Sequence, residues 1–121
     1  MILVIGGMAS GKRTYVRSLG FSDNQMDDGQ LGSNPVALNV QNLVSAGCEN
    51  ELDGKSSHLQ DLVDALAAKE VITCLEVGNG VIPLDRSERV WRDRVGHLAS
   101  ALAQRADSVV RMVCGIPVVL K

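Results

Sequence analysis

The feature that most constrains this chain is a glycine-rich segment near its start, GGMASGK at residues 6–12. Gly6, four intervening residues, Gly11 and Lys12 have the spacing of a phosphate-binding loop. In such a loop Gly6 allows a sharp turn after a strand, and Gly11 lets the backbone approach a phosphate without a Cβ in the way. Successive N–H groups and the start of the next helix hold the anion, and Lys12 reaches the terminal phosphates.

The surroundings of this segment favour the same interpretation. Residues 2–5 form an apolar run typical of a buried parallel strand, and residues 12–19 have a helical pattern. The alternative is a glycine-rich turn in an unrelated α/β protein, which does not require a strand directly before it and a helix directly after it. We therefore predict a nucleotide-binding loop, with Lys12 also catalytic. Its residues are Gly6, Gly7, Met8, Ala9, Ser10, Gly11, Lys12, Arg13 and Thr14.

One position of the loop departs from the usual pattern. The residue after the lysine is normally Ser or Thr, whose hydroxyl ligates Mg²⁺, but here it is Arg13. Thr14 cannot take the same place, because one step along a helix turns the side chain by about 100°. A charged arginine cannot ligate a metal, although it can offer positive charge to a phosphate. The sequence predicts GTP or ATP binding in which Mg²⁺ contributes less than usual.

The remaining elements follow from hydrophobic spacing and turn residues. We expect loops over residues 20–34 and 48–55 and around Gly78, Gly80 and Pro83. We expect a helix opening at Pro35 and ending before Gly47, one opening at a Ser57–Gln60 capping box, and one over residues 87–104. Further strands are predicted over residues 71–75, 109–114 and 118–120, the last two separated by Gly115 and Pro117.

Strands that alternate with helices indicate a mainly parallel sheet. The predicted fold is α/β, P-loop NTPase-like, with a mainly parallel sheet flanked by helices. Its length of 121 residues suits a single nucleotide-binding domain over residues 1–121.

Composition narrows the possible partners and compartment. The net charge is −2, and there is one Trp, one Tyr and one Phe, so a nucleic-acid partner is not expected. The N-terminal apolar run, about five residues long, is too short for a signal peptide or a membrane span. Cys48, Cys74 and Cys114 are far apart, and the last two lie in apolar runs where a cysteine is usually buried. A cytoplasmic protein is expected.

The C-terminal third carries a resemblance. EVGNGVIP at residues 76–83 is followed by WRDRVGHL, ADSV and GIPVVLK. Together with GGMASGK, these segments resemble the bifunctional adenosylcobinamide kinase and adenosylcobinamide-phosphate guanylyltransferase family of cobalamin biosynthesis. The resemblance implies a P-loop fold, ATP or GTP, Mg²⁺, a corrinoid substrate and a homo-oligomer, a trimer in the family. Family enzymes phosphorylate cobinamide and then transfer GMP through a guanylylated histidine.

The middle of the chain departs from that family. The family's H-R-x-x-R-P segment has no counterpart in residues 20–34, and the chain's histidines are His58 and His97 alone. Alignment of the family's D-C-L-T segment puts Asn34 at the aspartate and Ala37 at the threonine. The resemblance therefore implies a truncated, divergent corrinoid kinase or nucleotidyltransferase. The alternative is a non-catalytic nucleotide-binding relative, acting as a regulator or subunit partner.

Glu76 is the second candidate catalytic residue. It ends the strand predicted over residues 71–75, at the sheet edge where parallel sheets bind ligands. In that position it could hold Mg²⁺, directly or through water, or orient the corrinoid hydroxyl. The alternative is a carboxylate that accepts N–H bonds from the glycine-rich loop after it.

Overall fold

The computed structural model of the chain describes residues 1–44, 57–77 and 85–121. Its described strands form one sheet in the order β2-β3-β4-β1-β5-β6. Neighbouring strands are parallel throughout except β5 and β6, which form an antiparallel pair. The strands are β1 (Ile2–Gly6), β2 (Met26–Asp28), β3 (Val36–Leu38), β4 (Val71–Leu75), β5 (Ser108–Val113) and β6 (Ile116–Val119).

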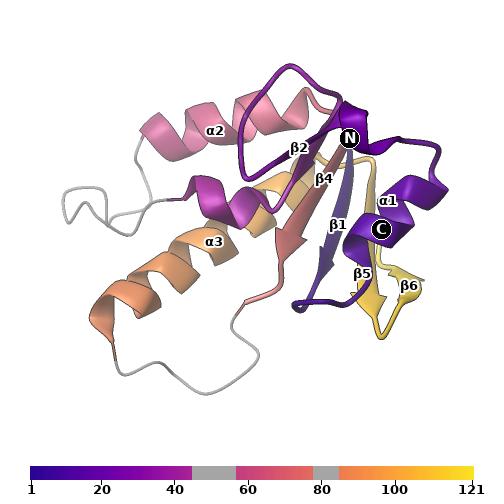
Figure 1. Cartoon of the computed structure of the whole chain (residues 1–121). Coiled ribbons are helices and arrows are strands. Elements are labelled where there is room, and N and C mark those ends of the chain that lie inside the picture. The colour runs from indigo at the N-terminus through magenta and orange to yellow at the C-terminus, as the bar shows by residue number, and fades with distance from the viewer. Residues whose placement is uncertain (45–56, 78–84) are drawn as a thin grey trace.

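Helices cover both faces of this sheet, as Figure 1 shows. α1 (Lys12–Ser18) lies on one face, and α2 (Ser57–Ala67) and α3 (Arg86–Arg105) lie on the other. Two short 3₁₀ helices, η1 (Asp23–Gln25) and η2 (Val40–Leu43), flank β2 and β3. The predicted α/β architecture with a mainly parallel sheet is confirmed.

Each face of the sheet has its own hydrophobic core. Leu3 of β1 packs in a cluster with Leu66 of α2 and Leu98 of α3. The next residue, Val4, packs in a second cluster with Val16 of α1. Because side chains alternate along a strand, a strand covered on both faces is apolar throughout. This accounts for the continuous apolar runs at residues 2–5 and 71–75.

The predictions for residues 20–34 and 35–46 were wrong in part. The first segment, predicted as loop, contains η1 and β2, and the second, predicted as a helix, contains β3 and η2. Val36 pairs with Met26 on one side and Val71 on the other, and all three residues of β3 are buried. Pairing with β4 and burial on both faces outweigh the helical spacing of this segment.

The other described elements lie close to their predicted positions. α3 begins after Asp85, whose side chain accepts a hydrogen bond from the backbone N–H of Ser87. β6 begins at Ile116, so Pro117 lies inside the strand and not before it. An edge strand tolerates proline because one side of its backbone needs no partner. The predicted loops at 48–55 and 78–83 and the Ser57–Gln60 capping box lie outside the described residues or side chains.

None of the helices that the structure describes is a candidate membrane span. Across residues 1–44, 57–77 and 85–121, every helix is too short or too polar to cross a bilayer.

Candidate phosphate-binding site

The glycine-rich segment joins β1 to α1 at the carboxyl end of β1, which lies between β4 and β5. Parallel α/β sheets bind ligands at this edge. A pocket of about 360 Å³ opens there. Residues 9–14 line it, together with Leu38 and Asn39 at the end of β3 and Thr73 on β4. Of the nine predicted loop residues, the structure thus brings six to the pocket, and the other three form the first turn of the loop.

Lys12 is buried beneath the loop, with 9% of its surface exposed. Its Nζ donates hydrogen bonds to the backbone oxygens of Gly7, at 2.6 Å, and Gly6, at 3.1 Å. Burial lowers the pKa of this ammonium group from its ordinary value, because the charged form loses water. Positive charge is therefore held at the base of the loop by the loop's own carbonyl groups.

The glycines of the loop are required by close contacts. A Cβ on Gly6 would collide with the Ser10 hydroxyl and lie 2.9 Å from the backbone oxygen of Met112. Gly11 has φ of +96°, and its Cβ would lie 3.2 Å from the Cα of Gly115. The Gly115 N–H also donates to the Ser10 backbone oxygen at 3.0 Å. The turn between β5 and β6 therefore supports the glycine-rich loop from one side.

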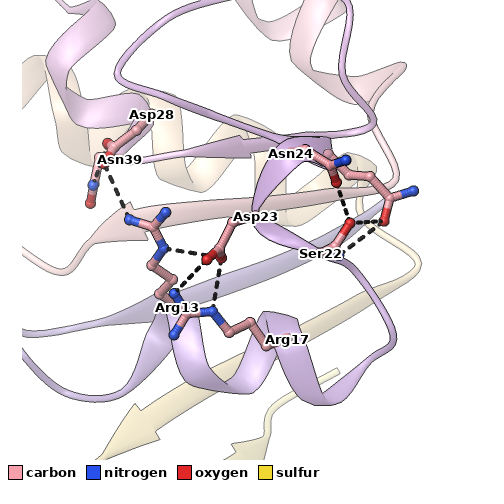
Figure 2. A network of polar contacts seen from close by, with 8 residues as sticks. Arg13, Arg17, Ser22, Asp23, Asn24, Asp28 and Asn39 are labelled. Atoms are coloured by element: carbon pink, nitrogen blue, oxygen red, sulfur yellow. Dashed lines mark hydrogen bonds and ion pairs between the residues drawn. The ribbon is translucent and has the colours of Figure 1, made fainter.

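Arg13 lies in a network of charged side chains that sequence reasoning did not foresee, shown in Figure 2. Its guanidinium is 3.8 Å from Asp23 and 3.8 Å from Asp28. Both carboxylates have a nearer partner: Arg17 donates to Asp23 at 2.8 and 3.1 Å, and Asn39 Nδ2 donates to Asp28 at 2.7 Å. The hydrogen bond from Arg17 holds the pKa of Asp23 below its ordinary value. Arg13 is thus more loosely paired with these carboxylates than Arg17 is.

Asn39 and Thr73 are site residues that the sequence did not identify. Asn39 follows β3 with φ of +55° and donates its backbone N–H to Thr73 Oγ1 at 2.9 Å. Gln41 Nε2 donates to Asn39 Oδ1 at 3.4 Å, and Gln41 Oε1 accepts the Leu75 N–H at 3.1 Å. The available signal was a polar residue directly after a short apolar run. The expected helix over this segment concealed it.

Glu76 lies at the end of β4, as predicted, beside the start of the loop. Its backbone N–H donates to the Gly6 oxygen at 2.8 Å, and its carboxylate accepts a bond from Arg111 Nε at 3.0 Å. The carboxylate is 22% exposed and is not among the described residues that line the pocket. A catalytic or metal-binding role of Glu76 stays a prediction. In that role, a carboxylate that is already paired with Arg111 would have to contact the substrate or the metal.

Mg²⁺ prefers carboxylate and other oxygen ligands, and the described pocket offers the hydroxyls of Ser10, Thr14 and Thr73 but no carboxylate. Arg13 occupies the hydroxyl position, and the neutral Asn39 stands at the end of β3. The nearby carboxylate of Asp28 is engaged by both. In the described part of the chain, no three His, Cys, Asp or Glu residues gather in a way that could hold a metal ion.

No histidine or cysteine with a described side chain is among the residues that line this pocket. His97 is exposed on α3, and His58 belongs to α2, where its side chain lies outside the description. Cys74 is buried as predicted, and burial raises the pKa of its thiol to about 12. Cys114 is exposed, which corrects the prediction, because it stands in the β5–β6 turn with φ of +51°. Cys48 lies outside the described residues.

A mainly parallel sheet, covered on both faces and carrying this loop after its central strand, defines a P-loop NTPase-like α/β protein. Residues 31–120 match the family model described as cobinamide kinase / cobinamide phosphate guanyltransferase. The chain belongs to this family. The matched range begins after the phosphate loop, so the assignment of the loop depends on its own sequence and geometry.

Two curated relatives agree with the family. The chain is 31% identical over 86 residues to the bifunctional adenosylcobalamin biosynthesis protein CobP of Pseudomonas aeruginosa, covering 71% of this chain and 50% of the relative. It is 36% identical over 76 residues to the bifunctional adenosylcobalamin biosynthesis protein CobU of Salmonella typhimurium, covering 63% of this chain and 42% of the relative. The aligned region thus spans about half the length of these relatives.

Proposed function

We propose that this chain binds GTP or ATP at residues 6–14 and acts in cobalamin biosynthesis on a corrinoid. The observation that carries the proposal is the position of Lys12, whose ammonium group is bonded to the Gly6 and Gly7 oxygens beside the pocket at the end of β1. A phosphate bound above the loop meets this charge and the guanidinium of Arg13. Family membership and the two relatives' printed names supply the cobalamin context.

Phosphorylation of the corrinoid is the reaction that these residues support best. Phosphoryl transfer needs mainly positioning and neutralisation of charge, which Lys12 and Arg13 provide. Guanylyl transfer through a histidine also needs an imidazole within roughly 3–3.5 Å of the α-phosphate.

A non-catalytic nucleotide-binding relative is the second candidate, favoured by the pairing of Glu76 with Arg111. A carboxylate held in an ion pair is not free to orient a substrate hydroxyl. Incubation with GTP labelled at the γ-phosphate and with cobinamide separates the two candidates. Labelled cobinamide phosphate supports the kinase, and nucleotide binding without it supports the non-catalytic relative.

The first prediction concerns nucleotide affinity. Lys12→Ala should weaken binding of GTP or ATP by at least tenfold, about 1.4 kcal/mol, in titration calorimetry. The loss follows from removing the buried ammonium group at the base of the loop. Lys69→Ala is the matched control, because Lys69 also donates to two backbone oxygens, those of Gly32 and Asn34. Equal affinity in wild type and Lys12→Ala would contradict the proposal.

The homo-oligomer implied by the resemblance, a trimer in the family, belongs to the same proposal. Sedimentation equilibrium of the purified chain checks it.

A further inference from the structure

Two positions where a P-loop protein holds its metal carry other residue types here. P-loop NTPases ligate Mg²⁺ with the hydroxyl after the loop lysine and with an aspartate from a neighbouring strand. In this chain the first position is Arg13. The second is Asn39, which follows the carboxyl end of β3. The alignment puts the family's aspartate at Asn34, but Asn34 precedes β3 and does not lie at this edge of the sheet. Arg13 and Asn39 both line the pocket beside the loop. One change adds a positive charge, and the other leaves a neutral amide where a carboxylate is usual.

The surrounding contacts fix these two residues relative to each other. Asp28 lies between them, 3.8 Å from the Arg13 guanidinium and 2.7 Å from Asn39 Nδ2, as Figure 2 shows. Asn39 is further held by Thr73 and Gln41 through its backbone N–H and its side-chain oxygen. The Arg13 side chain remains 48% exposed, and its two ion pairs are long. It is therefore positioned near the pocket but available to an anion.

We propose that the Arg13 guanidinium is a built-in cation that takes over the role of the metal, so that this site binds nucleotide phosphates without Mg²⁺. The inference rests on the proposed function, because it needs phosphates at residues 6–14. A guanidinium is always charged and can donate two parallel N–H bonds to a phosphate. A divalent cation placed beside it is repelled. Asp28 and Asn39 are positioning residues that orient Arg13.

The test is titration calorimetry with GTP and with ATP, each with Mg²⁺ and with EDTA. Wild-type affinity should be the same in both conditions. The double variant Arg13→Ser, Asn39→Asp restores a hydroxyl and a carboxylate at the two positions. Its affinity should be at least tenfold higher with Mg²⁺ than with EDTA, a difference of about 1.4 kcal/mol. Electron paramagnetic resonance of Mn²⁺ should show metal bound to the double variant with nucleotide and no such signal for wild type.

Arg105→Ser is the matched control, since Arg105 is 44% exposed and paired with Asp64 on α2. It should bind nucleotide as wild type does, with no response to Mg²⁺. A tenfold gain from Mg²⁺ in wild type would overturn this inference and leave the proposed function standing. A folded double variant, verified by circular dichroism, without any gain from Mg²⁺ would also overturn it. Absence of nucleotide binding by wild type in both conditions would overturn the proposed function itself, and this inference with it.

Discussion

Lys12 and Arg13 are neighbours in the sequence with different environments in the fold. Lys12 is 9% exposed and bonded to backbone oxygens, whereas the Arg13 side chain is 48% exposed and faces two aspartates. The difference arises because adjacent residues of a helix point about 100° apart. The lysine contributes charge from below the loop, and the arginine contributes charge at the mouth of the pocket.

The different exposure of Cys74 and Cys114 predicts that their thiols react at different rates. In a Cys48→Ser background at pH 8, Ellman's reagent should react quickly with Cys114 and with Cys74 only after unfolding. Cys114 is exposed, whereas Cys74 is buried with its thiol pKa raised to about 12, so its reactive thiolate is scarce. Two equivalents released rapidly from the native protein would contradict this.

The raised pKa of Cys74 also predicts how stability depends on pH. Between the ordinary thiol value of 9.0 and about 12, the unfolded chain loses this proton while the native protein keeps it. The native state then binds more protons, so the free energy of unfolding should fall as pH rises through this range. Cys74→Ala should show a shallower fall in denaturant titrations from pH 8 to pH 11. Equal slopes for wild type and Cys74→Ala would show that other titrating groups dominate the pH dependence of stability, and would contradict this prediction.

At the scale of elements, the loop is shaped by a segment that lies a hundred residues later in the chain. The β5–β6 turn places Gly115 against Gly11 and donates a hydrogen bond to Ser10. Glu76, following β4, bonds to Gly6 on the other side. The loop is therefore held by both strands that flank β1, and its shape depends on the whole sheet edge.

Replacing Gly11 in the glycine-rich loop and Gly96 in α3 with alanine should have opposite effects on the stability of the protein. Gly11→Ala should destabilise the protein by about 1–3 kcal/mol, because φ of +96° strains alanine and its Cβ contacts Gly115. Gly96→Ala, in α3, should stabilise it by about 0.5–1 kcal/mol, because a Cβ there meets nothing within 4 Å. Urea titrations measure both, and a neutral Gly11→Ala would argue against the strained loop geometry.

At the scale of the whole molecule, the histidines belong to helices on one face of the sheet, and the pocket lies at the carboxyl edge of the sheet beside α1 on the other face. The pocket is lined by Leu38, which packs in the same core as Val16 of α1. His58 and His97 belong to α2 and α3, which cover the opposite face. Val95, Leu98 and Leu102 of α3 are buried, whereas His97 is exposed. The exposed His97 is not among the described residues that line the pocket.

We therefore predict that the isolated chain forms no covalent guanylyl-histidine. Incubation with GTP labelled at the α-phosphate should leave no protein-bound label after denaturing chromatography. An acid-labile, base-stable label on His58 or His97 would show that this prediction is wrong. Double replacement by asparagine, which removes both imidazoles, is the control for assigning any label.

Features that depend on local patterns could be predicted from the amino-acid sequence alone. The glycine spacing predicted a phosphate loop between β1 and α1, and the apolar runs and helical periods located β1, α1, β4, α3 and β5. Each of these signals lies within one short segment, so it can be read without knowledge of the fold. The motifs of the C-terminal third similarly pointed to the family that the comparison shows.

The contacts between residues of the candidate site could not be predicted in this way, because they join segments that are distant in the sequence. β2 and β3 have three residues each, too few to show a period, and β3 forms because its pairing with β4 buries it. Asn39 and Thr73 are 34 residues apart in the sequence and become bonded only when these strands align. Glu76 and Arg111, 35 residues apart, meet across the end of β1 for the same reason. Contacts between distant segments depend on strand order, which no local pattern encodes.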